Sequence, residues 1–280
     1  MSLTLHLAHH APAASDTPLL VVVLPQAPAL TEALASLDAS VGGALSRSIA
    51  RRDFRGGRDE ALLLIGGEGG IQRVLLVGHG SAALTRTTAR RAAAVAARQA
   101  MKLGVGAMHL YAADASDDVV EGLAIGAAAG SWEFTDLRTP APEADRRAPL
   151  ADATILAADR ESARTAFSAA VALGEGQAIA KRLGMLPGNY CTPETFVEVG
   201  REIAARHGMT VTVLGRADME REKMGAFLAV AQATPEEPRL VVLEYKGGAA
   251  DAAPVVLMGK GICFDTGGIS IKPAPEMEWM

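Results

Sequence analysis

The sequence is poor in aromatic residues, and this limits how its core can be built. Phenylalanine, tryptophan and tyrosine make up only 4% of the 280 residues, whereas apolar residues as a whole make up 49%. Alanine and glycine are abundant instead. We therefore expect cores of alanine, valine and leucine packed at helix and strand spacing, which favours layered α/β structure. The length is enough for two ordinary domains.

Three further shortages exclude classes of protein. The two cysteines, Cys191 and Cys263, stand in no CxxC or histidine spacing, which argues against a zinc finger or disulfide framework and suits a reducing, cytoplasmic setting. The formal net charge of −5 gives the whole chain no attraction to phosphate backbones. The longest apolar run, residues 19–24, is too short to cross a membrane, and we expect no secretory signal at the N-terminus.

Strand and helix patterns alternate through the first half of the chain. Apolar runs closed by proline or glycine at 19–24, 62–65 and 74–77 are typical of strands buried on both faces, and we expect them at the centre of the first sheet. This alternation predicts a largely parallel sheet with helices on its faces. The other elements expected here are helices over 85–103 and 117–129 and strands over 107–111 and 153–157.

A second α/β unit is expected after residue 188. The stretch 139–149 is rich in proline and charge and predicts a surface loop, and helical spacing then runs from Glu161 to Leu186. At Thr192-Pro193-Glu194 an N-cap hydroxyl, a proline and an acid predict a new helix that reaches about His207. Strands are expected to follow over 211–214, 240–245 and 255–258.

The chemically informative residues follow the last of these expected strands. The string GKGICFDTGGISIKP, residues 259–273, places Lys260, Asp265 and Lys272 among four glycines. Ligands bind at the carboxyl ends of strands in open α/β sheets, and glycine lets the backbone approach a ligand closely. We therefore expect a binding site here.

The residue types in this string suit a site for two metal ions. A lysine ligates a metal only as the neutral amine, so Lys260 would need a pKa depressed by burial and an adjacent dication. The carboxylate of Asp265 has two oxygens and can bridge two ions, which can share a water and lower its pKa. Lys272 would be a second, protonated lysine beside a substrate carbonyl. Taken singly, each residue is more typical of a solvated lysine or a turn aspartate.

Two other protein classes contain fragments of this string. An apolar residue followed by Asp-Thr-Gly occurs in aspartic proteases, but these have an all-β fold, whereas this chain alternates helix and strand. Asp-x-Gly-Gly also occurs in the phosphate loop of sugar kinases and actin-like ATPases, where the aspartate lies on an early hairpin. Neither class requires both flanking lysines.

The complete string resembles the metal-binding signature of the cytosolic leucyl aminopeptidases, including both lysine-to-aspartate spacings. The resemblance covers roughly residues 180–280, while over the first 160 residues it is one of layout alone. One departure is Ala231-Gln232-Ala233-Thr234, where the family more often has a turn containing Gly-Ser. The further stretches that carry the resemblance are Asn189-Tyr190-Cys191-Thr192-Pro193, Met224 to Val230, Pro238-Arg239-Leu240 and Glu244-Tyr245-Lys246-Gly247.

The resemblance implies a fold and a division of the chain. It implies an N-terminal, mostly parallel α/β accessory domain over 1–160 and a connecting helix over 161–188. A zinc-exopeptidase-like catalytic domain would begin at 189 and extend beyond 280. In the family, further Asp and Glu ligands and a catalytic Arg follow the second lysine. We therefore expect the 280 residues to be a fragment of a longer polypeptide.

The resemblance also implies an activity and its residues. Lys260 would ligate one metal, Asp265 would bridge both, and Lys272 would be the catalytic lysine that polarises the substrate carbonyl. Two divalent ions per subunit, Mn²⁺ or Zn²⁺, would hold a bridging hydroxide that attacks the N-terminal peptide bond. The implied substrates are peptides with leucine or another apolar residue at the N-terminus, and the implied assembly is a homo-oligomer, a hexamer.

A DNA-binding or regulatory role for the first domain, without hydrolysis, is the alternative. It depends on a basic helix face over 85–103, and some members of the resembled family bind DNA. The acidic net charge and the absence of interleaved aromatics favour a solvated face instead. The basic residues of this face are Arg86, Arg90, Arg91, Arg98 and Lys102.

Overall fold

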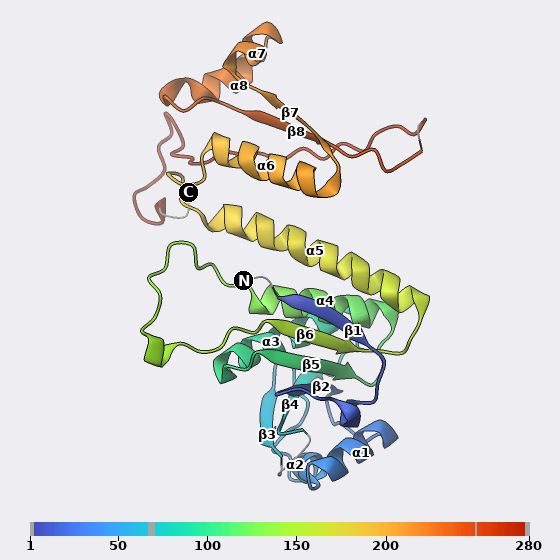
Figure 1. Ribbon diagram of the computed structural model, residues 1–280. Helices are drawn as coiled ribbons and strands as arrows, with labels where there is room; N and C mark the ends of the chain where they lie inside the picture. Colours follow the sequence, from blue (N-terminus) through green and yellow to red (C-terminus); the bar gives the residue numbers. More distant parts are fainter. Residues whose placement is uncertain (1–2, 67–70, 250, 278–280) are drawn as a thin grey trace. The chain divides into compact units, whose positions relative to one another are not determined.

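The computed structural model describes residues 3–66, 71–249 and 251–277, and the chain divides into two compact units, Met1–Lys181 and Arg182–Met280 (Figure 1). The strands are β1 (Thr4–Ala8), β2 (Leu20–Pro25), β3 (Ala61–Ile65), β4 (Arg73–Gly80), β5 (Ala107–Ala112), β6 (Asp152–Leu156), β7 (Thr210–Leu214) and β8 (Leu240–Glu244). The α-helices are α1 (Glu32–Ser40), α2 (Ala44–Ala50), α3 (Arg86–Leu103), α4 (Asp117–Ser131), α5 (Glu161–Met185), α6 (Pro193–His207), α7 (Arg216–Arg221) and α8 (Gly225–Val230). Short 3₁₀ turns are η1 (Pro12–Ala14), η2 (Glu143–Asp145) and η3 (Ala231–Ala233).

The first unit is built on one sheet, which the described residues form in the strand order β1-β6-β5-β2-β4-β3. β1 with β6, β6 with β5, β5 with β2 and β2 with β4 are all parallel pairs, and β3 alone runs antiparallel to its neighbour. The expected α/β class and largely parallel sheet are therefore confirmed. None of the helices in the described ranges is long and apolar enough to span a bilayer.

The side chains of β2 alternate between two separate cores. Val21 and Val23 pack with alanines of α3 and residues of α4 on one face of the sheet. Leu20 and Val22 pack on the opposite face with leucines of α1 and α2. All of these β2 side chains are buried. A strand that is apolar on both faces is stable here because helices cover both faces.

Helices α3 and α4 pack unusually closely because glycines of α4 face the backbone of α3. A Cβ built on Gly122 would lie 2.4 Å from the carbonyl oxygen of Arg86, and one built on Gly126 would lie 2.2 Å from that of Arg90. Gly130 makes a similar approach, with 2.6 Å to the carbonyl oxygen of Ala94. Since real Cβ atoms do not come so near to oxygen, only glycine permits this spacing between the two helices.

The helices expected over 85–103 and from Thr192 are present, and each has a threonine at its N-cap. Thr85 caps α3 by accepting a hydrogen bond from the Thr88 N–H, while the Thr88 side chain accepts one from the Thr85 N–H. Thr192 and Thr195 make the same reciprocal pair at the start of α6. Such caps satisfy N–H groups that the first turn of a helix would otherwise leave unpaired.

The second unit places α6 against a two-stranded antiparallel sheet of β7 and β8. Gly200 of α6 faces Val241 of β8, with 3.0 Å from a built Cβ to the valine Cγ1 atom. Arg239, at the start of β8, donates to Glu194 in the first turn of α6 at 3.0 Å and lies 3.1 Å from Glu237. This arginine therefore ties the helix start to the strand start.

Two sequence predictions are wrong. Residues 62–65 do not lie at the centre of the sheet: they belong to β3, which is an edge strand, and Ile65 is 68% exposed. Residues 255–258 form no strand, and Val255 and Leu257 are 90% and 93% exposed. In both cases a strand needs neighbours to bury its apolar faces, and an apolar run does not tell which neighbours exist.

We predict that Gly126→Ala destabilises the protein, whereas Gly176→Ala does not. The new methyl at position 126 would collide with the Arg90 carbonyl and force α3 and α4 apart, and overpacking of this kind costs about 1–3 kcal/mol. Gly176 lies in α5 with no atom within 4 Å of a built Cβ, so alanine there removes only glycine's poor helix propensity. Urea unfolding of both variants measures the difference. Equal midpoints would contradict the close packing of α3 on α4.

Candidate metal-binding site

The glycine-rich string forms a closed loop between Asp265 and Lys272. The Lys272 N–H donates to the Thr266 carbonyl oxygen at 2.8 Å, and the Gly267 N–H donates to the Asp265 carboxylate at 3.0 Å. Gly267 has a φ of +86°, and a Cβ there would lie 2.3 Å from the Ser270 carbonyl oxygen. The chain therefore turns back on itself at Gly268-Ile269, just after Gly267, and position 267 requires glycine.

This loop brings the three residues named by the sequence around one carboxylate oxygen. Asp265 Oδ2 lies 3.1 Å from Lys272 Nζ and 3.8 Å from Lys260 Nζ. The hydrogen bond from Lys272, together with the one from the Gly267 N–H and the charge of Lys260, lowers the pKa of Asp265 below its ordinary value. Asp265 is thus held ionised, as a metal ligand must be.

The donor set fits part of a divalent metal site. The 3.8 Å between the Lys260 amine and the Asp265 carboxylate is less than twice a metal–ligand distance of about 2.1 Å, so one ion could contact both. A complete first shell needs at least four ligands. Within 3–66, 71–249 and 251–277 no cluster of three His, Cys, Asp or Glu side chains could hold a metal.

Lys260 departs from the sequence-based expectation in its burial. The neutral amine that ligation requires was expected in a buried setting, yet the Lys260 side chain is 74% exposed. The reason is the same as for residues 255–258, which precede it: no neighbouring strand covers this stretch among the described residues. The Lys272 side chain is better enclosed, at 32% exposed.

The loop before α6 packs against the glycine-rich string. A Cβ on Gly188 would lie 3.1 Å from the Cys263 carbonyl oxygen and 3.2 Å from the Phe264 Cβ. Cys191, at the end of this loop, is buried, and burial raises the pKa of its thiol. A thiol of raised pKa is poorly nucleophilic, which agrees with a structural role. Both cysteines are free.

The sequence predicted the charged residues of this site but not the backbone contacts that hold them in place. It placed Asp265 and the two lysines after a strand, whereas a short loop brings them together. It did not anticipate the contact of Gly188 with Cys263, although the stretch 189–193 beside it carried part of the resemblance. A glycine next to a proline, as in Pro187-Gly188, was the available signal for a close approach.

Comparisons with known proteins identify the family of the chain. The sequence profile described as the cytosol aminopeptidase family, catalytic domain, matches residues 178–280, and the profile of the N-terminal domain of the same family matches residues 21–141. The chain belongs to the cytosol aminopeptidase family. A probable cytosol aminopeptidase of Alkalilimnicola ehrlichii is 37% identical over 263 residues, which are 90% of this chain and 52% of that protein.

Solved structures of related enzymes have the same fold as this member of the cytosol aminopeptidase family. A tomato leucine aminopeptidase variant superposes with a TM-score of 0.74 at 24% identity, over 86% of this chain and 50% of that one. A bottromycin maturation enzyme, BotP, in complex with Mn has a TM-score of 0.72 at 26% identity, over 94% of this chain and 53% of that one. The chain thus spans about half the length of the relatives it matches.

We predict that Lys272→Met raises the pKa of Asp265 in the metal-free protein more than Lys260→Met does. Lys272 is nearer to the carboxylate and donates a hydrogen bond to it, whereas Lys260 acts through its charge alone. Carbon-13 NMR titration of the aspartate carboxyls measures both shifts. Lys246→Met, which removes a lysine beside Glu244, is the matched control and should leave Asp265 unchanged.

The sign of the associated stability change follows from the lowered pKa. Because Asp265 is more acidic in the folded state, its contribution to stability is present above the ordinary carboxyl pKa of about 4 and is lost as pH falls through the lowered value. Lys272→Met should therefore reduce the dependence of stability on pH below about 4. A larger shift from Lys260→Met than from Lys272→Met would contradict the arrangement of the loop.

Proposed function

We propose that the polypeptide containing this chain is a metal-dependent aminopeptidase that releases N-terminal residues from peptides. Membership of the cytosol aminopeptidase family supports the reaction class. The observation that carries the proposal is the convergence of Lys260 and Lys272 on the Asp265 carboxylate. A carboxylate held ionised between an amine that can ligate a metal and an ammonium group that can donate a hydrogen bond is suited to metal-assisted amide hydrolysis.

In this proposal Lys260 and Asp265 are metal ligands. Asp265 presents Oδ2 toward both lysines, while its Oδ1 accepts the Gly267 N–H, which fixes the plane of the carboxylate. Lys260 would lose its proton on binding the ion, because only the neutral amine has a free electron pair. Two divalent ions, when bound, would polarise the substrate carbonyl and lower the pKa of a water between them.

Lys272 is proposed as the catalytic residue that touches the substrate. Its ammonium group would donate a hydrogen bond to the carbonyl oxygen of the N-terminal residue and stabilise the negative charge that forms there during attack. Asp265 accepts from this ammonium and so orients it. The hydrogen bond from the Lys272 N–H to the Thr266 carbonyl oxygen holds the backbone of Lys272 in place. Such preorganisation lets the charge be stabilised without rearrangement of the loop.

The finer features of the proposal come from the family resemblance. We propose a preference for leucine and other apolar N-terminal residues, Mn²⁺ or Zn²⁺ as the ions, cytoplasmic location and assembly into homohexamers. The Mn complex of BotP supports manganese as the first ion to test. We also propose that residues 1–160 act as an accessory domain, 161–188 as the connecting helix and 189–280 as the start of the catalytic domain.

We predict that the longest polypeptide containing this chain hydrolyses leucine p-nitroanilide only when metal is present. Chelation should abolish turnover, and added Mn²⁺ or Zn²⁺ should restore it. Lys272→Ala should lower kcat by roughly 100- to 1,000-fold while leaving metal content unchanged, because the variant loses a donor to the developing oxyanion but no ligand. Metal content is measured by atomic emission and turnover by absorbance.

Asp265→Asn and Lys246→Ala complete this test. Asp265→Asn should lower the affinity for Mn²⁺ by more than about 100-fold, since it removes the charge of a proposed ligand. Lys246 is exposed and pairs with Glu244 outside the loop, so Lys246→Ala should retain full activity. A folded, metal-loaded polypeptide without turnover would refute the proposed function, and full activity of Lys272→Ala would refute its proposed role.

A further inference from the structure

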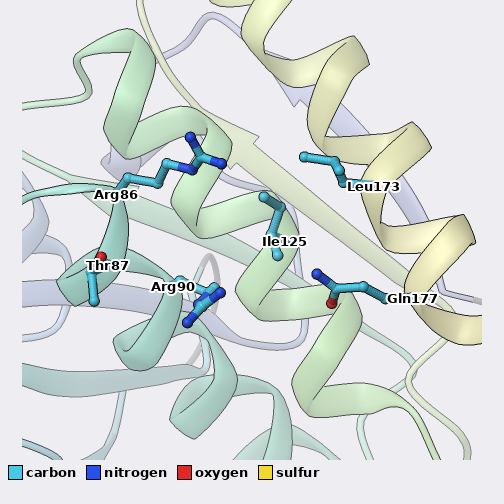
Figure 2. Close-up of a pocket in the computed structure, with 6 residues that line it drawn as sticks. All are labelled: Arg86, Thr87, Arg90, Ile125, Leu173 and Gln177. Atoms are coloured by element: carbon cyan, nitrogen blue, oxygen red, sulfur yellow. The ribbon is translucent and has the colours of Figure 1, made fainter. Parts of the chain in front are cut away.

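A hollow of about 340 Å³ lies between α3, α4 and α5 in the first unit, and none of its lining residues belongs to the candidate metal site (Figure 2). Arg90 of α3 and Gln177 of α5 point into it from opposite sides, and Ile125 of α4 lies between them. Pockets for small molecules occupy roughly 300–1,000 Å³, so this one suits a ligand at the small end of that range. Its lining residues are Arg86, Thr87, Arg90, Ile125, Leu173 and Gln177.

The hollow follows from how closely the three helices can approach. Glycines of α4 bring it into contact with the backbone of α3, and Gly174 of α5 lies against Ala128 of α4, with 3.1 Å from a built Cβ to the alanine methyl. Leu173 and Gln177 are one turn apart on α5 and so share the side of the helix that faces the hollow. The small residues therefore hold α5 close to α4. The longer side chains nearby surround the space that remains between the helices.

Within the part of the chain that the structure describes, the charges around the hollow leave one arginine without an acidic partner. Arg86 lies 3.1 Å from Glu121, so its charge is balanced. Arg90 has no acidic partner among the described residues, and the side chains of Thr87 and Gln177 have no hydrogen-bond partner there either. One guanidinium, one amide and one hydroxyl are thus available to a ligand. A single net positive charge matches a monoanion better than a phosphate dianion.

The apolar side chains restrict the ligand further. Ile125 is buried at the base of the hollow, whereas Leu173 is 44% exposed at its edge. An exposed leucine beside an unpaired arginine suits a ligand with an aliphatic group next to an anionic one. The planar fork of arginine is matched by a carboxylate, which can accept two parallel hydrogen bonds from it.

We propose that this hollow binds a small carboxylate with a branched aliphatic chain, the carboxylate on Arg90 and Gln177 and the chain on Ile125 and Leu173. A free aliphatic amino acid and the carboxyl-terminal residue of a peptide share this chemistry. Binding would connect α3 to α5 across the gap. The proposal stands on the first unit alone and does not require the proposed aminopeptidase activity.

Calorimetric titration of the metal-free, longest available polypeptide with three related ligands tests the proposal. N-acetylleucine represents a peptide end, leucine a free amino acid, and leucinamide lacks the carboxylate. We expect leucinamide not to bind and at least one of the other two to bind saturably at one site. Binding of N-acetylleucine alone identifies the carboxyl-terminal residue of a peptide as the ligand, and binding of leucine alone identifies a free amino acid. Binding of both shows that the site does not distinguish a free amino group from an acetylated one.

Three variants separate a specific site from a general charge effect. Arg90→Gln should weaken binding by about five- to tenfold, because it removes the charged hydrogen-bond donor. Arg98→Gln removes a charge from the same helix outside the hollow and should leave binding unchanged. Leu173→Ser should weaken the binding of whichever carboxylate binds the unsubstituted protein, because it removes an apolar contact for the aliphatic chain. Circular dichroism confirms that each variant is folded, and Arg90→Lys replaces Arg90→Gln if the latter is not.

Each of three results would overturn the proposal. The first is the absence of saturable binding of both carboxylates to the folded protein. The second is binding of leucinamide with the same affinity as the carboxylates, which would show that the hollow does not recognise a carboxylate. The third is an equal loss from Arg98→Gln and Arg90→Gln, which would show that the overall charge of α3, and not the hollow, attracts the ligand.

Discussion

The first unit depends on covering both faces of its central strands. β2 is apolar on each side and has no polar face to present to water, so its burial requires a helical layer above and below the sheet. On one side the large side chains of leucines in α1 and α2 fill the space against the sheet. On the other side the small alanines of α3 and glycines of α4 let the two helices pack closely together. This close packing explains how a chain with 4% aromatic residues can still form a dense core.

The same requirement is not met near the candidate metal site, and the site is therefore held by local contacts. Residues 255–258 are as apolar as β2, but no strand covers them among the described residues, and they remain exposed. The arrangement of Asp265 and Lys272 does not rely on them, because it is set by hydrogen bonds within a few residues of the loop. Lys260, which precedes the loop, lacks that support and is largely exposed.

The features that the sequence predicted well are those encoded over short distances. Thr85 and Thr192 begin helices because their own side chains satisfy nearby N–H groups, and alternation of strand and helix indicated parallel pairing. The aspartate and two lysines of the candidate site also lie within one short string. Features set by distant partners could not be predicted in this way. The runs at 62–65 and 74–77 look alike, yet one is an edge strand and the other is buried.

The short helices α1, α2, α7 and α8 show the same limit. Each is between six and nine residues long, too short for a periodic pattern to stand out from the surrounding sequence. Arg90 and Gln177 illustrate it for a binding surface: they are far apart in the chain and belong to different helices. From the pattern of its own helix, Arg90 was interpreted as a residue of a solvated or DNA-binding face. The neighbouring sequence does not show which residues of another helix lie opposite it.

At three points along the contact between α3 and α4, no side chain of α4 separates the two backbones. Backbone meets backbone at Gly122, Gly126 and Gly130, where a slight approach meets hard repulsion and a slight separation loses attraction. A change in the spacing of the two helices is therefore opposed at all three glycines. α5 is attached to α4 differently, through Gly174 and through Lys181, whose amine lies 5.4 Å from the Trp132 ring centre. Ala163 and Ala170 of α5 are buried in the same core, so a change in the spacing of α3 and α4 would also disturb the packing of α5.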